Sequence, residues 1–177
     1  MKFSRIPQLI PAGSYEVNVP LDLLEDKIQK WEQNPRYQLN LNPDFQRGHV
    51  WTQAQQTAYV EYFLKGGRSG MVIYFNQPAW RGEVGADGYN DFVIVDGLQR
   101  LTALRQFLRG ELRVFGHLVH EFEDDISRAH NADALKFNIN SLPTRKAVLE
   151  WYEQMNSGGT PHAPEELDRV RELIKHA

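Results

Sequence analysis

The hydrophobic pattern of the chain predicts two buried strands separated by a long loop. Residues 71–75 and 92–95 are short runs of β-branched, aromatic and other apolar residues without apolar–polar alternation, which is typical of strands covered on both faces. The intervening residues 76–90 contain three glycines and one proline, which favour a loop or an irregular hairpin.

Amphipathic spacing predicts helices on either side of these strands. The first helix has apolar residues at intervals of four and three within residues 24–31 and ends before Pro35. The second begins at a capping box, in which Thr52 and Gln55 each satisfy a backbone amide of the other, and the glycines at 66–67 end it. The sequence before residue 20 is rich in proline, which predicts an extended lead-in.

A third helix, residues 98–109, follows the second strand directly and repeats leucine at intervals of three or four. Residues 112–122 are expected to form one or two strands, and residues 134–177 a helical C-terminal part. Strands interleaved with helices in a chain of 177 residues predict one domain, residues 1–177, with an α+β or α/β fold. The pattern does not determine the strand order.

The composition narrows the class of protein. Hydrophobic residues make up 41% of the chain and aromatic residues 11%, which excludes a wholly disordered protein. No apolar run approaches the ~20 residues that cross a bilayer, so we expect a cytoplasmic protein without a membrane partner. The absence of cysteine excludes disulfides, thiol nucleophiles and thiolate metal sites. The net charge of −3 argues against binding nucleic acid by bulk charge alone.

The chemistry concentrates where the second strand runs into the third helix. Gly97 allows the backbone to turn sharply, and the free amides of the following helical turn form a natural anion site. Gln99 can donate to an oxygen, and Arg100 has the planar fork that suits phosphate. Asp96 can hold Mg²⁺, which prefers carboxylate and phosphate oxygens. The same residues could instead have a purely structural role, as an Asp-Gly turn with Asp96 as a helix cap and Arg100 on the surface.

Two further segments offer polar groups. In residues 42–51, Arg47 lies among aromatic residues just before the second helix, where it can add positive charge to a phosphate pocket or simply pair with a nearby acid. Residues 155–160 place Asn156 before two glycines, which either end a helix or present amides to a ligand. Taken alone, residues 42–51 are better explained as an ordinary loop and residues 155–160 as a helix end. They indicate a binding site only when they are considered together.

Together these segments resemble one known family. PDFQRGHVW, residues 43–51, resembles the QR…W box of GmrSD-type restriction endonuclease N-terminal domains. IVDGLQRLTAL, residues 94–104, is similar to the family hallmark, usually DGQQRLT, and NSGGTP, residues 156–161, resembles a later segment. The three occur in the family's order, and the resemblance covers roughly residues 20–170.

The resemblance implies a fold related to ParB and sulfiredoxin, with a small mixed sheet, packed helices and a C-terminal helical segment. It also implies that the domain binds a nucleoside triphosphate with Mg²⁺ and takes part in DNA restriction and phage defence. Whether the nucleotide is hydrolysed is left open. By the same resemblance Asp96 is the metal residue, and the catalytic residues are Asp96, Gln99 and Arg100. The implied nucleotide-binding residues are Gln46, Arg47, Gly97, Thr102, Asn156 and Gly159.

The chain departs from the family pattern at two positions: Leu98 stands where the family usually has glutamine, and His162 where it has an apolar residue. His117, His120 and His130 do not form the pattern of an HNH nuclease, so none is expected, and a separate nuclease subunit would have to supply cleavage.

Two alternatives to a nucleotide-binding domain stay open. One is a phage- or element-borne DNA-binding or adaptor protein that keeps the fold without turnover. The other is a Mg²⁺-dependent nuclease that uses Asp44, Asp96 or the acidic residues within 121–125.

Overall fold

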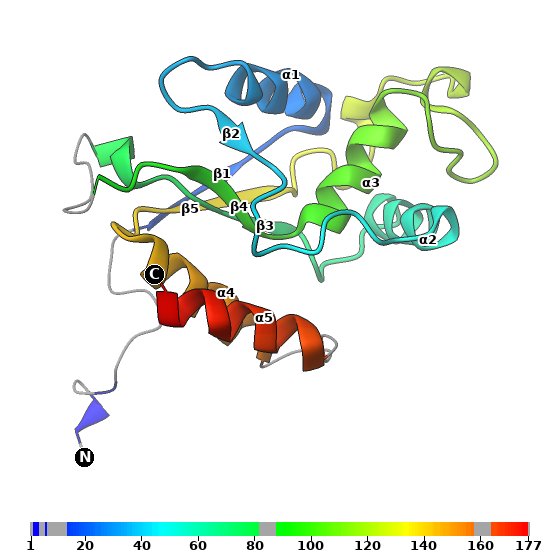
Figure 1. Cartoon of the computed structure of the whole chain (residues 1–177). Helices are drawn as coiled ribbons and strands as arrows, with labels where there is room; N and C mark the ends of the chain where they lie inside the picture. Colours follow the sequence, from blue (N-terminus) through cyan, green and yellow to red (C-terminus); the bar gives the residue numbers. More distant parts are fainter. Residues whose placement is uncertain (1, 4–5, 7–13, 82–87, 158–163, 177) are drawn as a thin grey trace.

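The computed structural model consists of a five-stranded sheet with helices on both faces (Figure 1). It describes residues 2–3, 6, 14–81, 88–157 and 164–176. The strands are β1 (Ser14–Asn18), β2 (Leu39–Asn40), β3 (Val72–Asn76), β4 (Phe92–Asp96) and β5 (Lys136–Asn140). The helices are α1 (Leu21–Glu32), α2 (Gln53–Leu64), α3 (Leu98–Leu108), α4 (Arg145–Ser157) and α5 (Pro164–His176). None of these helices is both long and apolar enough to cross a membrane.

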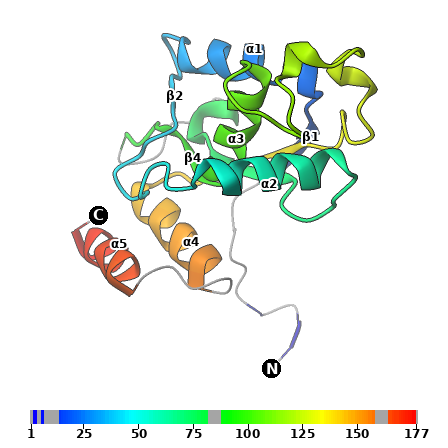
Figure 2. The same ribbon diagram turned by 90° about the vertical axis from the view of Figure 1, so that its right-hand side faces the viewer.

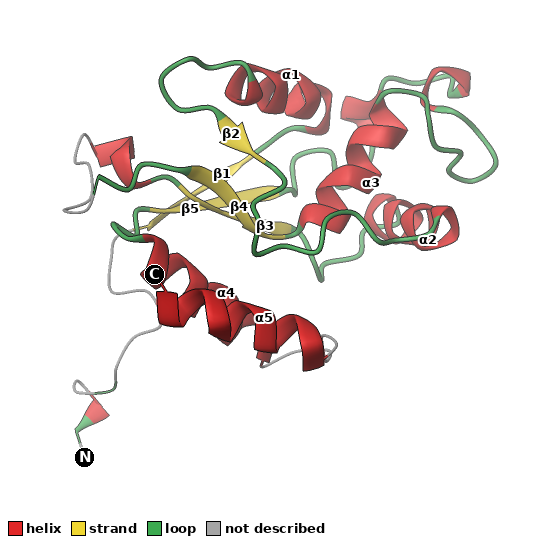
Figure 3. Cartoon of the chain, viewed as in Figure 1, coloured by secondary structure: helices red, strands yellow, loops and turns green. Residues whose placement is uncertain are grey.

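The sheet is mixed, with strand order β1-β5-β3-β4-β2 (Figure 3). β3 pairs antiparallel with β4 and parallel with β5, while the two-residue β2 pairs parallel with β4 at one edge. The predicted α+β fold is therefore confirmed. β4 is an interior strand between β3 and the short β2, and β3 occupies the middle of the sheet.

Two hydrophobic clusters lie on opposite faces of the sheet and explain why its central strands lack alternation. The side chains of Phe92 and Ile94 pack in the larger cluster with α1, α2 and α3, whereas Val93 and Val95 pack in the second cluster with α4. Figure 2 shows the same division, with α1–α3 on one side of the sheet and α4 and α5 on the other. Because both faces are covered, every residue from Phe92 to Val95 is buried.

The local signals for α2 and α3 are confirmed. The Oγ1 of Thr52 accepts from the backbone amide of Gln55, whose side chain accepts in turn from the amide of Thr52, so the capping box is complete. α3 buries Leu101 and Leu104 against the sheet and begins directly after Gly97, whose φ is +98°. These two helices therefore begin where local chemistry predicts.

The sequence prediction missed three strands, and one of them lies in the segment expected to be helical. β5 alternates Phe137 and Ile139, which are fully buried in the larger cluster, with Asn138 and Asn140, which are also buried. Two buried asparagines conceal the strand from a hydrophobic pattern, and β5 forms because β1 and β3 flank it on both sides. The helical C-terminal part accordingly begins at Arg145.

The prediction of strands within residues 112–122 is wrong. Val114 and His117 exchange backbone hydrogen bonds of 2.8 and 3.0 Å across a tight turn, and a 3₁₀ helix, η3 (Val119–Glu121), follows. The bridge is isolated, so no neighbouring strand extends it into a ladder. β-propensity alone does not make a sheet without such a partner.

Buried ion pairs join α1 to α3. Arg105 is only 7% exposed, and its guanidinium donates to Glu25 and Glu32. Arg109 also donates to Glu25. Burial alone would raise the pKa of Glu25, but hydrogen bonds from Arg105, Arg109 and Gln29 lower it from 4.5 to about 2. Arg105 and Arg109 therefore connect two helices and are not spare positive charges.

Acidification should weaken the fold through Glu25. Because the pKa of Glu25 is lower in the folded chain than in the unfolded one, its contribution is complete above pH 4.5 and disappears as the pH falls towards 2. We expect roughly 1–3 kcal/mol of unfolding free energy to be lost over this range. Urea unfolding of the wild type and of Glu25→Gln at several pH values measures it. Equal pH slopes for the two proteins would contradict the prediction.

Candidate functional site

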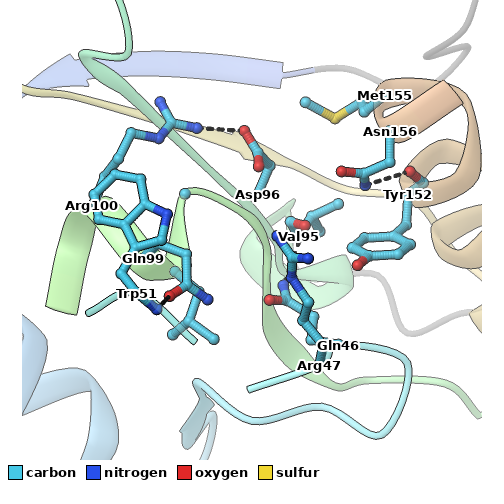
Figure 4. A pocket seen from close by; sticks show the side chains of 12 residues that line it. Gln46, Arg47, Trp51, Val95, Asp96, Gln99, Arg100, Tyr152, Met155 and Asn156 are labelled. Carbon is cyan, nitrogen blue, oxygen red and sulfur yellow. Dashed lines mark hydrogen bonds and ion pairs between the residues drawn. The ribbon is translucent and has the colours of Figure 1, made fainter. Parts of the chain in front are cut away.

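A cleft of about 310 Å³ opens at the carboxyl end of β4, between the start of α3, the loop before α2 and the end of α4 (Figure 4). Its lining brings together segments from three distant parts of the chain. The lining residues are Gln46, Arg47, Trp51, Val95, Asp96, Gly97, Leu98, Gln99, Arg100, Tyr152, Met155 and Asn156. The structure therefore places the three polar segments singled out in the sequence around one cavity.

Gly97 shapes the floor of the cleft. Its φ of +98° is strained for any residue with a side chain, and a Cβ there would lie 2.7 Å from Cδ1 and 3.3 Å from Cα of Ile73. Gly97 is also the N-cap of α3 and, having no side chain, forms no capping hydrogen bond. The first amides of α3 and the positive end of its dipole therefore remain available to an anion.

Asp96 and Arg100 form an ion pair beside this helix start (Figure 4). The Nη2 of Arg100 lies 2.5 Å from Oδ2 of Asp96, and its Nη1 donates to the carbonyl of Val72 at 2.9 Å. The Asp96 side chain is 35% exposed and that of Arg100 18% exposed, so both are accessible from the cleft. The pair holds a carboxylate and a guanidinium in fixed positions at its mouth.

Gln99 is engaged with the opposite wall of the cleft. Its Oε1 accepts from the amides of Val50 and Trp51 at 2.9 and 3.1 Å, and its Nε2 donates to the carbonyl of Gly48 at 2.7 Å. Three hydrogen bonds to backbone groups leave this side chain little capacity to bind a ligand. The geometry makes Gln99 a positioning residue that fixes the loop carrying Arg47.

Gln46 holds the same loop from its other end. Its Nε2 donates to the carbonyls of Ile94 and Val95, at 2.8 and 3.1 Å, where β4 ends. Arg47, the next residue, lines the cleft. The two glutamines thus attach the loop to β4 and α3, which determines where the Arg47 guanidinium can reach.

The end of α4 forms the third wall. Asn156 is buried, its Nδ2 donates to the carbonyl of Tyr152 at 2.7 Å, and Met155 lies next to it. Sequence reasoning included Met155 in the candidate segment 155–160 but missed Tyr152 as a lining residue. The helical spacing was the available signal, because a residue four positions before Asn156 lies on the same face of the helix.

Several predicted site residues lie elsewhere or are already engaged. The hydroxyl of Thr102 donates to the carbonyl of Leu98 at 2.8 Å, and Thr102 is not part of the cleft lining. Leu98, at the position of the family glutamine, is buried in the larger hydrophobic cluster, so this departure exchanges a polar contact for core packing. Gly159 lies outside the described residues, as does His162.

The acidic residues considered for a nuclease site do not lie together in the structure. Asp44 accepts from Arg145 at 2.7 and 2.9 Å and lies outside the cleft lining. Glu121 pairs with Arg113, and Asp125 accepts from the amide of Ser127. Within the described residues no three His, Asp or Glu side chains lie close enough to share a metal ion. Among the residues that the structure describes, Asp96 is the one acidic side chain that lines the cleft.

Aromatic residues support the wall that carries Trp51. The rings of Trp51 and Tyr59 meet at an angle of 60° with centroids 5.6 Å apart, and the Tyr59 hydroxyl donates to the carbonyl of Gly70 at 2.9 Å. Burial raises the pKa of Tyr59 to about 12, although the nearby Arg100 charge opposes the shift. Tyr59 therefore stays protonated and keeps this hydrogen bond at any physiological pH.

Comparison with known proteins identifies the family to which the chain belongs. The model of the family described as GmrSD restriction endonuclease, N-terminal domain, matches residues 21–135. The chain belongs to this family. Searches of curated proteins and of solved structures gave no significant match. In this GmrSD N-terminal domain, the two glutamines, both cleft arginines and Asp96 lie inside the matched segment, whereas the wall formed by α4 lies beyond it.

Loss of the Gln99 hydrogen bonds should loosen the Arg47 loop. In Gln99→Glu the acceptor for Val50 and Trp51 remains, but the donor to Gly48 is replaced by a carboxylate oxygen that repels that carbonyl. We expect a loss of about 1–3 kcal/mol in unfolding free energy and faster hydrogen exchange at residues 48–51. Gln106→Glu, on the same helix, is the control. Unchanged exchange in Gln99→Glu would refute the positioning role.

Proposed function

We propose that this GmrSD N-terminal domain binds a nucleoside triphosphate together with Mg²⁺ in the cleft, and that binding serves DNA restriction. One observation carries the proposal. Arg47, Arg100 and the start of α3 line one cavity from two sides, together with the Asp96 carboxylate. Membership of the family indicates the link to restriction, and the cleft supports the choice of ligand.

The cleft is suited to a polyphosphate because it combines different kinds of donor. The amides at the start of α3 can cradle phosphate oxygens, since Gly97 lets a ligand approach the backbone closely. Arg100, from the same turn, and Arg47, from the opposite loop, can reach the ligand from two directions. Guanidinium groups bind phosphate through two parallel hydrogen bonds, which fixes its orientation as well as adding affinity.

The donor set also fits a phosphate-bound Mg²⁺ better than a metal held by protein alone. Mg²⁺ in nucleotide sites is usually bound by one or two carboxylates together with phosphate oxygens and water. From the described part of the chain, the cleft receives one carboxylate, that of Asp96, whose Oδ2 contacts Arg100. When bound, the ion would neutralise phosphate charge at that carboxylate, and the Arg100 guanidinium would be released towards the phosphates.

A second candidate function is nucleotide or DNA binding without turnover, as in an adaptor that recruits a separate nuclease subunit. The specific observation that favours it is the engagement of both glutamines with backbone groups. Neither side chain is positioned to orient an attacking water in this conformation. Leu98, buried in the core, offers no polar replacement. This geometry therefore favours binding without hydrolysis.

A thermal-shift screen of the four nucleoside triphosphates, each with and without Mg²⁺, tests the proposal directly. A ligand at 100 times its dissociation constant adds about 2.7 kcal/mol of stability, which raises the melting temperature by several degrees in a chain of this size. Phosphate release measured on the same samples separates hydrolysis from binding. No shift with any triphosphate at millimolar concentration would refute nucleotide binding.

Asp96→Asn should remove the Mg²⁺-dependent part of nucleotide binding. The amide keeps the shape of the carboxylate but lacks its charge, so triphosphate should stabilise the variant equally with and without Mg²⁺. Asp44→Asn is the matched control, because Asp44 pairs with Arg145 outside the cleft lining. Thermal shifts of both variants decide the matter. A Mg²⁺ dependence that survives in Asp96→Asn would place the metal elsewhere.

A further inference from the structure

A second cavity, of about 220 Å³, lies beyond the C-terminal end of α3, remote from the cleft. Six large apolar side chains from α2, α3, the 114–117 turn and the segment 119–126 line it: Leu64, Phe107, Phe115, Val119, Phe122 and Ile126. In Figure 1 the yellow-green segment that follows α3 forms this end of the molecule. We refer to these six residues as the apolar pocket.

The apolar pocket is formed but not closed. Phe122 packs edge-on against Phe107, with ring centroids 6.0 Å apart, and against the ring of His117 at 5.7 Å. Phe122 nevertheless remains 39% exposed and Phe115 40% exposed. Two large aromatic side chains around one hollow present an apolar surface of the kind that marks interaction sites.

The backbone at Phe115 provides an independent observation. Among the described residues, Phe115 is the one non-glycine residue with a positive φ, +51°, and Gly116 follows with +81°. Together with the reciprocal hydrogen bonds between Val114 and His117, these values indicate a two-residue hairpin turn of type I′, which normally carries asparagine or glycine. A phenylalanine is unfavourable there, and such outliers cluster at functional sites.

The charges around the apolar pocket are asymmetric. Asp124 and Asp125 line one rim together with Arg128, whose Nε lies 4.0 Å from Oδ2 of Asp124, and Glu123 adds a third carboxylate in an adjoining shallow hollow. The ammonium of Lys65 covers the opposite side, 5.1 Å from the centroid of the Phe115 ring. Because these carboxylates outnumber the Arg128 guanidinium, an incoming chain would meet net negative charge along this rim.

We propose that the apolar pocket docks a segment of a partner protein that presents one aromatic or branched aliphatic side chain beside lysines or arginines. The volume fits one such side chain, since a cavity of ~150 Å³ already accommodates benzene. The basic neighbours of that side chain would face Asp124 and Asp125. Docking leaves the cleft open, because the two sites lie at opposite ends of the 11-residue α3, roughly 15 Å apart along its axis.

The full chain can be titrated with a nine-residue peptide that has a central tryptophan between two pairs of lysines, with amide chemical shifts as the readout. We expect shifts concentrated at residues 114–129 and a Kd of roughly 0.1–1 mM. A peptide with serine in place of the tryptophan should bind at least about tenfold more weakly, because apolar burial drives docking. Shifts spread over the surface, or equal binding of both peptides, would overturn the proposal.

Two variants separate docking from folding. Phe115→Asn removes the ring at a turn position that favours asparagine, so the melting temperature should not fall while peptide affinity drops about tenfold. Asp124→Lys, at a side chain 78% exposed, should weaken binding two- to fivefold in low salt only. Unchanged affinity in Phe115→Asn would refute the site. Concentration-dependent dimerisation that occupies the same residues would identify a second copy as the occupant and also refute it.

Discussion

Replacement of Arg100 by alanine should weaken binding of a nucleoside triphosphate by roughly 10- to 100-fold. Arg100 lies in the first turn of α3, where the helix amides and dipole act on the same ligand, and its guanidinium lies at the mouth of the cleft. A charge-assisted hydrogen bond to phosphate contributes about 1.5–3 kcal/mol, which corresponds to this loss. Isothermal titration calorimetry of the wild type and the variant measures it.

The control for Arg100 has to come from the far end of the same helix. Arg105 is unsuitable, because it is buried between Glu25 and Glu32 and its loss would leave two carboxylates without their partner. Arg109 is more exposed and pairs with Glu25, so Arg109→Ala should leave nucleotide affinity within about twofold. Equal losses in the two variants would mean that the ligand responds to net charge alone. An unchanged affinity in Arg100→Ala would show that the phosphate does not bind at this turn.

Gly97→Ala should lower the free energy of unfolding by roughly 2–4 kcal/mol. One part of the cost is the positive φ, which penalises any L-residue with a side chain by about 1–2 kcal/mol. The other part is steric, because the new methyl group would lie 2.7 Å from Cδ1 of Ile73 and 3.3 Å from its Cα. Ile73 lies fully buried in β3, so its side chain cannot move freely away from the new methyl group. Chemical denaturation monitored by circular dichroism gives the value.

Gly116→Ala separates the two parts of this cost. Gly116 has a φ of +81°, but a Cβ there would meet no atom within 4 Å. It should therefore lose only about 1–2 kcal/mol, the cost of the backbone conformation. If Gly97→Ala is no more destabilising than Gly116→Ala, the close approach of β3 to the turn is not a constraint. A larger loss at Gly97 would show that the floor of the cleft depends on the absence of a side chain.

The sequence alone determined the elements whose signals are local. The capping box at Thr52 and the periodic leucines of α3 depend only on neighbouring residues, and both helices begin within a residue of the predicted position. The strand–turn–helix at Asp96 was recognisable for the same reason, because a buried apolar run, a glycine and an amphipathic helix follow each other directly. These signals also sufficed to place the chain in its family, which the family match confirms.

Tertiary structure alone decided what depends on partners distant in the chain. β5 contains two asparagines and becomes a strand because β1 and β3 pair with it, whereas residues 112–122 have β-propensity but no strand beside them. The sequence suggested that Gln99 binds a ligand. In the structure, its side-chain amide forms hydrogen bonds with backbone groups of residues about 50 positions earlier in the chain. Contacts across such separations arise only when the core assembles, so no local pattern encodes which partner a polar side chain will find.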